Sequence, residues 1–315
     1  MQKLESAFAE ALARPAPILL DGGLATQLEA QGCDIGNALW SASLLTTDTQ
    51  AIVDATRAYL DAGAECIATA SYQASRDGFA TLGLSAREAD ELMLLSVELA
   101  KRARDEFLAE YPNCEYVPLI AASIGPYGAA LHDGSEYTGS YGVGAAELCT
   151  FHGDRLALFD NSDADVLALE TIPSITEATV LDELLRSCRT PAWISFSCRD
   201  ERRICDGTPV EEAARLFRDH PTVLAVGVNC TAPQYVPSLI REIRRVLPDK
   251  AILAYPNSGE TYDVANNAWL GTVSPLDCAS AAEEWVAAGA TVVGGCCRMG
   301  PEHISAMAKR LKELG

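Results

Sequence analysis

Eight short apolar runs, each followed by polar loop residues and then by a stretch with helical periodicity, constrain the fold of this chain more than any other feature. Their nearly continuous apolarity is typical of parallel strands that are covered on both faces. Eight strands alternating with helices predict an α/β fold of the (β/α)8 TIM barrel type, although a doubly wound sheet would give a similar pattern. The runs are PILLDGG (17–23), ECIATASY (65–72), YVPLIAASIG (116–125), DVLALET (165–171), AWISFSC (192–198), VLAVGVNC (223–230), AILAYPNSG (251–259) and TVVGGCC (291–297).

The rest of the chain gives no sign of a second domain. Its 315 residues contain no shift in composition, no Pro/Gly/Ser-rich linker and no repeat beyond the βα unit. We therefore expect one barrel domain spanning residues 1–315. No GxGxxG motif follows a strand, and neither GxxxxGK[ST] nor GxSxG occurs, so nucleotide binding and serine hydrolysis have no support.

The formal net charge of −20 argues against nucleic acid or an anionic membrane surface as a partner, because both would repel the protein. A small-molecule substrate is expected instead. The sequence has no run of eighteen apolar residues and no basic segment followed by a hydrophobic core near its start. We therefore expect a cytoplasmic protein.

The eleven cysteines are odd in number and lie mostly in apolar stretches, which favours reduced thiols over a disulfide framework. Cys296 and Cys297 form an unusual adjacent pair after Gly294 and Gly295. Neighbouring side chains of a strand point to opposite faces, so such a pair can serve one centre only where the chain leaves the strand. The two glycines permit that departure.

In a barrel the active site lies at the carboxyl ends of the strands, so the residues that close each run are candidates. Strands six and eight have one neighbour between them, which puts their ends ~10 Å apart, and their loops could converge on one ion. Three thiolates on Zn²⁺ leave a fourth position open, as in catalytic zinc sites. The alternative is that these are three buried thiols. The candidates are Asp21 (strand one), Glu170 (strand four), Asn229 and Cys230 (strand six), and Cys296 and Cys297 (strand eight).

The carboxylates allow two interpretations. Asp21-Gly22-Gly23 is either a tight turn that caps the next helix, or a carboxylate beside glycine N–H groups that would bind the ammonium and carboxylate of an amino acid. Glu170 ends a buried strand and needs a partner there. The histidines lie in polar loop or helix contexts without an HxxxH or HxH pair, so none is assigned to a metal: His132, His152, His220 and His303.

Taken together, these residues resemble the homocysteine S-methyltransferase family. The matching segments cover nearly the whole chain, and the combination of an Asn-Cys strand end with a terminal Gly-Gly-Cys-Cys is the most specific part. They are LLDGGLATQLEAQG, LWSA, TASYQAS, SIGPYGAALHDGSEYTGSY, LALETIP, GVNC, YPNSGE and GGCCRMGPEHI.

The resemblance implies a zinc-dependent barrel in which the metal activates the thiol of L-homocysteine for methylation to methionine. By position, the zinc ligands and catalytic residues would be Cys230, Cys296 and Cys297. The amino-acid part of the substrate would be held by the residues Asp21, Gly22, Gly23 and Glu170, with Asn229 beside them.

The longest non-helical insertion follows the third strand, GPYGAALHDGSEYTGSYGVG at 125–144. It resembles the branch of the family that uses S-methylmethionine, with S-adenosylmethionine as a possible poorer donor. Its aromatic and acidic residues suit a sulfonium cation. The candidate donor residues are Trp40, Tyr72 and Tyr127, with Asp133 or Glu136 adding charge.

Two other functions remain open at this stage. One is a selenocysteine-type methyltransferase that uses the same site on a selenol. The other is a barrel that binds zinc or buffers thiols without catalysis. Metal analysis combined with a methionine-formation assay separates these classes.

Overall fold

The computed structural model describes residues 6–36, 39–259, 261–263, 268–270 and 274–313. Its central element is a sheet of eight parallel strands in the order β1-β10-β7-β6-β5-β4-β3-β2. A parallel bridge between Leu20 and Cys66 joins the first strand to the last and closes the sheet into a barrel. The predicted (β/α)8 barrel is therefore confirmed. The strands are β1 (Ile18–Leu19), β2 (Cys66–Ala68), β3 (Leu119–Ile124), β4 (Val166–Ile172), β5 (Ala192–Phe196), β6 (Val223–Asn229), β7 (Ala251–Tyr255) and β10 (Val292–Val293).

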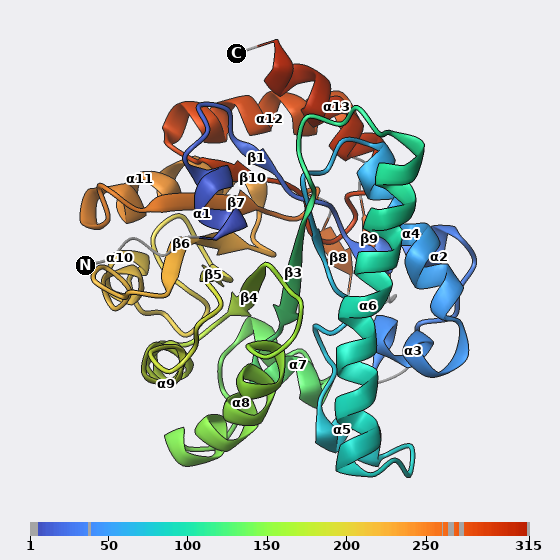
Figure 1. Ribbon diagram of the computed structural model, residues 1–315. Helices are drawn as coiled ribbons and strands as arrows, with labels where there is room; N and C mark the ends of the chain where they lie inside the picture. The colour runs from blue at the N-terminus through green and yellow to red at the C-terminus, as the bar shows by residue number, and fades with distance from the viewer. Residues whose placement is uncertain (1–5, 37–38, 260, 264–267, 271–273, 314–315) are drawn as a thin grey trace.

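Helices surround this barrel and connect its strands (Figure 1). Each strand is followed by at least one helix before the next barrel strand begins, which makes every crossover a βαβ unit. The helices are α1 (Ala7–Leu12), α2 (Leu24–Ala30), α3 (Leu44–Thr47), α4 (Thr49–Asp61), α5 (Arg76–Ala80), α6 (Ala86–Glu110), α7 (Tyr127–Leu131), α8 (Ala145–Phe159), α9 (Ile175–Leu185), α10 (Val210–Arg215), α11 (Val236–Val246), α12 (Pro275–Ala288) and α13 (Pro301–Lys312), with short 3-10 helices η1 (Trp40–Ser43), η2 (Ser135–Tyr137) and η3 (Pro233–Tyr235).

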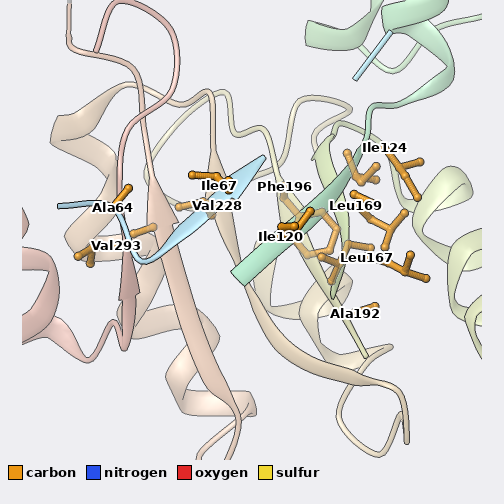
Figure 2. Close-up of a cluster of buried hydrophobic side chains, with 14 of the residues drawn as sticks. Ala64, Ile67, Ile120, Ile124, Leu167, Leu169, Ala192, Phe196, Val228 and Val293 are labelled. Atoms are coloured by element: carbon orange, nitrogen blue, oxygen red, sulfur yellow. The ribbon is translucent and has the colours of Figure 1, made fainter. Parts of the chain in front are cut away.

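Alternate residues of each strand enter two separate cores. One set points outward and packs under the helices, and Figure 2 shows several of its members, among them Ile67, Ile120 and Phe196. The other set fills the barrel and includes Leu20, Ala121, Ala168, Trp193, Ala225 and Leu253. Burial on both faces explains why the strands read as continuous apolar runs.

The two ends of the barrel differ. Helix α1 closes the amino end, where the ring of Phe8 lies 5.8 Å from that of Trp193. At the carboxyl end the inward positions become polar. In strands β3 to β7, the interior positions at the carboxyl end hold Ser123, Glu170, Ser195, Asn229 and Tyr255, all buried.

Three features of the fold differ from the sequence-based expectation. Strands β1 and β10 are only two residues each, shorter than the runs that contain them. The segment 125–144 was predicted to be non-helical but contains α7 and η2. A small antiparallel pair, β8 (Thr261–Asp263) and β9 (Ala268–Leu270), follows β7 and was not predicted. Among the described residues, no helix is both long enough and apolar enough to cross a lipid bilayer.

Candidate metal and amino-acid site

Three cysteines meet at the carboxyl end of the barrel. The sulfur atoms of Cys230, Cys296 and Cys297 all lie within 4.8 Å of one another, and all three residues are half-buried. The Sγ atoms of Cys230 and Cys297 are 3.9 Å apart. Strand β7 lies between β6 and β10, as the sequence predicts. This arrangement can hold a metal ion.

The backbone explains how an adjacent pair reaches one centre. The chain leaves β10 at Gly294, where a Cβ would lie 2.6 Å from that of Leu20. The N–H of Gly295 then donates to the carbonyl of Asp21 at 2.9 Å, and the N–H of Cys296 donates to Pro256 at 2.9 Å. These bonds hold both sulfurs on the inner side of the barrel mouth.

Hydrogen bonds and burial set the protonation of the three thiols. Cys297 accepts hydrogen bonds from Cys230 and Cys296, which lower its pKa well below the usual thiol value. The pKa of Cys230 is raised well above that value because its thiol is hydrogen-bonded to Cys296 and Cys297 and is buried. Without a cation, the cluster therefore favours one thiolate over three. A divalent cation would supply the missing positive charge.

Two carboxyl groups lie beside the cysteines without a cationic partner. Asp21 and Glu170 are only 9% and 8% exposed, and no salt bridge reaches either one within the described part of the chain. Burial raises the pKa of Asp21 to about 8, against the hydrogen bond from the Ala68 N–H and with a further rise from Glu170. Burial raises the pKa of Glu170 to about 7, against hydrogen bonds from Ser123 and Tyr255. Such a pair is suited to binding a cation.

The polar layer inside the barrel fixes Glu170. The hydroxyl of Ser123 donates to Glu170 Oε1 at 2.5 Å. Tyr255 is itself placed by the indole N–H of Trp193, which donates to its hydroxyl at 3.1 Å, and by Ser195 at 2.5 Å. Glu170 is therefore held from two sides by residues of β3 and β7.

Asn229 connects the carboxylate side to the cysteine side. Its Oδ1 accepts from the N–H of Thr171 at 2.7 Å, and its Nδ2 donates to the Thr171 hydroxyl at 2.8 Å. Thr171 has a φ of 62°, an unfavourable conformation for a β-branched residue, so these bonds hold a strained residue in place. Nδ2 also lies 4.0 Å from the sulfur of Cys296.

Gly22 and Gly23 are required by close backbone approach. A Cβ at Gly22 would lie 2.1 Å from the carbonyl oxygen of Met299, and one at Gly23 would lie 2.8 Å from that of Cys296. The N–H of Gly23 donates to Met299 at 3.0 Å. Both glycines therefore lie directly against the segment that carries the cysteine pair.

The candidate donor residues fall in different places. Burial raises the pKa of the Tyr72 hydroxyl, and the nearby Cys230 and Glu136 raise it further. The ring of Tyr127 packs instead against Tyr141 and Phe151, with centroids 5.5 and 5.1 Å away. The backbone of Trp40 lies in η1, but its side chain is outside the described structure.

The two acidic candidates also differ. Asp133 is exposed and accepts from the N–H of Ser135 at 2.9 Å. Glu136 is 9% exposed, and its Oε2 has no hydrogen-bond partner among the described residues. Burial raises the pKa of Glu136, and the neighbouring Asp133 and then Cys297 raise it further. Glu136 therefore lies near the cysteines, whereas Asp133 caps a turn.

Several residues around the site were not predicted from the sequence. Ser123, Ser195 and Tyr255 carried a signal, since each is the polar residue two positions after an apolar interior residue. Tyr137, whose pKa is raised above all by its proximity to Cys230, had no such signal beyond the loop composition. His152 was expected in a polar context, but it is fully buried against Glu177.

We expect the metal-free protein to lose stability as the pH rises from about 5 to about 8. The folded pKa values of Asp21 and Glu170, about 8 and about 7, lie above their ordinary values of 3.8 and 4.5. In this window the folded state holds protons that the unfolded chain has released, so its free energy of unfolding falls with pH. Urea denaturation with chelator and reductant measures this fall, which should be smaller in Asp21→Asn and Glu170→Gln. An identical fall in all three proteins would contradict the prediction.

The chain is similar to known proteins over nearly its whole length. A family model described as homocysteine S-methyltransferase matches residues 18–311. Homocysteine S-methyltransferase YbgG of Bacillus subtilis (strain 168) is 45% identical, with 94% of this chain and 95% of that protein covered. The selenocysteine Se-methyltransferase of Brassica oleracea var. italica is 40% identical, with 93% and 88% covered.

A solved structure agrees with these matches. The crystal structure of the homocysteine methyltransferase MmuM from Escherichia coli, in its metallated form, superposes with a TM-score of 0.87 at 38% identity. The superposition covers 96% of this chain and 99% of that one. Since the family model and the relatives both span nearly the full length, this chain belongs to the homocysteine S-methyltransferase family.

Proposed function

We propose that this protein uses zinc to transfer a methyl group from S-methylmethionine, or less efficiently S-adenosylmethionine, to L-homocysteine, giving methionine. One observation carries the proposal: three cysteine sulfurs lie within 4.8 Å of one another beside two buried carboxyl groups. A thiol-lined metal site favours a sulfur ligand, and a pair of carboxylates favours an ammonium group. Homocysteine carries a thiol and an ammonium on one short chain. Both halves of the site lie in what we propose to be a single domain, residues 1–315.

The cysteine geometry supports zinc as the metal. Sulfur ligands at ~2.3 Å from a tetrahedral zinc ion lie ~3.8 Å from each other. The 3.9 Å between the sulfurs of Cys230 and Cys297 is close to that value. Three soft protein ligands would leave one position for a substrate, the pattern of catalytic zinc. When bound, zinc would favour the deprotonated, nucleophilic form of a substrate thiol at neutral pH.

The carboxyl groups would bind and orient the amino acid. Asp21 and Glu170 would accept hydrogen bonds from its ammonium group, which would restore their ionised forms. The backbone at Gly22 and Gly23 would pass beside its carboxylate, because no side chain stands there. Asn229 would hold Thr171 and Cys296 at a fixed separation. This separation would set the distance between the carboxyl groups that bind the ammonium and the cysteine sulfurs.

We call residues 125–144 the donor loop, and we propose that it helps to form the pocket for the methyl donor. Glu136 would face the positive charge of a sulfonium ion, with Tyr72, Tyr127 and Trp40 supplying aromatic surface.

In the reaction, the homocysteine sulfur forms a bond to the methyl carbon while the bond from that carbon to the donor sulfur breaks. The electron pair leaves with a neutral thioether, so no general acid is required. Alignment of the two sulfurs should supply most of the acceleration.

A metal analysis combined with a methionine-formation assay tests this function. We expect bound zinc and methionine formation that stops when the metal is removed with a chelator and resumes on zinc addition. Stoichiometric zinc without turnover on any methyl donor would instead support a non-catalytic zinc or thiol-buffering barrel.

We predict that kcat/KM is higher with S-methylmethionine than with S-adenosylmethionine, and that betaine gives little turnover. S-methylmethionine is compact, whereas S-adenosylmethionine needs room for its adenosine, and the sequence holds no recognisable nucleotide-binding motif. In betaine only one carbon separates the carboxylate from the cationic nitrogen, whereas three separate it from the cationic sulfur in S-methylmethionine, so betaine would bring its anion closer to Glu136 and the cysteine cluster. A side-by-side assay at fixed homocysteine, with zinc and reductant present, ranks the donors. Betaine as the best donor would overturn the assignment of the donor loop, and leave the homocysteine assignment standing.

A selenol acceptor is the second candidate function. The relative from Brassica oleracea var. italica, a selenocysteine Se-methyltransferase, is 40% identical to this chain. Selenocysteine carries its ammonium group on a shorter side chain than homocysteine. The ratio of kcat/KM for the two acceptors, measured with the same donor, decides between them.

A further inference from the structure

A buried charged cluster lies behind the donor loop, outside the site described above. Glu177 and His152 are fully buried and Arg155 is 2% exposed. His152 and Arg155 belong to α8 and Glu177 to α9, two neighbouring helices in Figure 1. Ionisable groups are rarely buried unless they are paired, so the bonds they make indicate what they do.

The carboxylate of Glu177 joins both ends of the donor loop to helix α9. Its Oε1 accepts from the backbone N–H of Tyr127 at 2.7 Å, near the start of the loop. Its Oε2 accepts from the hydroxyl of Tyr141 at 2.7 Å, near the end. Ser135, Glu136 and Tyr137 lie between these two points, so one side chain fixes the limits of the segment that faces the cysteines.

Arg155 fixes the beginning of the donor loop and the strand end next to it. Its Nη1 donates to the carbonyl of Gly125 at 2.8 Å, and its Nη2 donates to that of Tyr72 at 2.9 Å. A weaker bond reaches Ser71 at 3.4 Å. Burial lowers the pKa of Arg155 to about 10, with Glu177 acting in the opposite direction, so the guanidinium is charged at neutral pH.

His152 orients Glu177 rather than the loop. Its Nε2 lies 2.7 Å from Glu177 Oε1, the same oxygen that accepts from Tyr127. Burial lowers the pKa of His152, which makes the imidazole neutral at physiological pH. A neutral ring with its proton on Nε2 donates to the carboxylate and holds it in the orientation that the loop requires.

We infer that Glu177, Arg155 and His152 are positioning residues for the methyl donor: they set the donor loop and Tyr72 against the cysteine cluster without touching either substrate. If the cluster only joined α8 to α9, its hydrogen bonds would run between residues of those two helices. Among the side-chain hydrogen bonds of the described residues, only the one between His152 and Glu177 does so, and the others lead to Tyr127, Tyr141, Gly125, Tyr72 and Ser71. None of the bonds described here joins the cluster to the carboxyl pair or to the cysteines. The inference rests on the proposed function only in placing the donor on this side of the site.

Tyr141→Phe is the mildest test, because it removes one bond to Glu177 and keeps the ring. With the donor that gives the highest wild-type turnover, we expect kcat/KM for that donor to fall on the order of tenfold to a hundredfold. The KM for homocysteine and the metal content should stay within about twofold of the wild type. Tyr111→Phe, at the exposed end of α6, removes a hydroxyl that makes no described bond to this cluster. It should change neither kcat/KM for the donor nor the KM for homocysteine.

The outcome separates positioning from general loosening. Unchanged donor kinetics in Tyr141→Phe, or equal losses for both substrates, would overturn the inference. A second comparison uses His152→Gln, whose amide can donate to Glu177, and His152→Leu, which cannot. We expect donor kcat/KM to be higher in the glutamine variant at equal metal content, and equal values would also count against the inference. If wild-type turnover is best with S-adenosylmethionine, the proposed preference for S-methylmethionine fails while this test remains valid, whereas betaine as the best donor would overturn the donor-loop assignment and this inference with it.

Discussion

Replacing Cys230, Cys296 or Cys297 singly by alanine is expected to abolish both metal retention and methyl transfer. Loss of outer partners that only support a ligand already costs ~10–100-fold in metal affinity, and loss of a ligand itself should cost more. The barrel should remain folded, because all three side chains are half-buried at its mouth rather than in either apolar core. Metal content per protein, methionine formation and circular dichroism measure the three effects separately.

Two other cysteines provide matched controls. Cys149 is exposed on α8, and Cys198 is buried near the end of β5, so alanine at these positions removes a thiol without touching the cluster. Both variants should keep the metal. Full metal occupancy in Cys230→Ala, Cys296→Ala or Cys297→Ala would remove that residue from the set of ligands.

The fold could be predicted because strand β4 and its neighbours are buried on both faces. In β4, Leu167 and Leu169 pack under the helices while Val166 and Ala168 fill the barrel, so the strand appears as an unbroken apolar run. Eight such runs allow few arrangements. The same logic placed Asp21, Glu170, Cys230 and Cys296 at one end, because parallel strands share the edge where they stop.

Contacts made across the fold by helices and loops could not be predicted in this way. Glu177 and Arg155 lie on amphipathic helices, where a charged residue usually faces solvent. They are buried here because α8 packs against α9 and because the donor loop contacts both residues. The strain at Thr171 has the same origin. Its φ of 62° is held by two hydrogen bonds with Asn229, 58 residues away in the chain, one donated by the Thr171 N–H and one donated by Asn229 Nδ2.

Neutralising either carboxyl group beside the cysteines is expected to weaken homocysteine binding strongly. Asp21→Asn or Glu170→Gln removes one charged acceptor for the ammonium group, which should cost ~1.5–3 kcal/mol. That loss corresponds to a rise of roughly 10–150-fold in the dissociation constant. Because both groups would hold the same ammonium, the effects in the double variant should not be additive.

The metal and the donor separate this role from a structural one. Neither substitution removes a sulfur ligand, so metal content should equal that of the wild type, and the KM for the donor should change far less than the KM for homocysteine. As a control, Glu212→Gln changes an exposed glutamate of α10, removes the same charge and should affect neither metal content nor either KM.

The raised pKa values of Asp21 and Glu170 add a second readout, because an ammonium group that restores both carboxylates must displace their protons. Homocysteine binding near pH 6 should therefore release protons, measurable as a buffer-dependent heat in titration calorimetry. Loss of either carboxyl should reduce this release, and an unchanged homocysteine KM in Glu170→Gln would exclude Glu170 from the ammonium site.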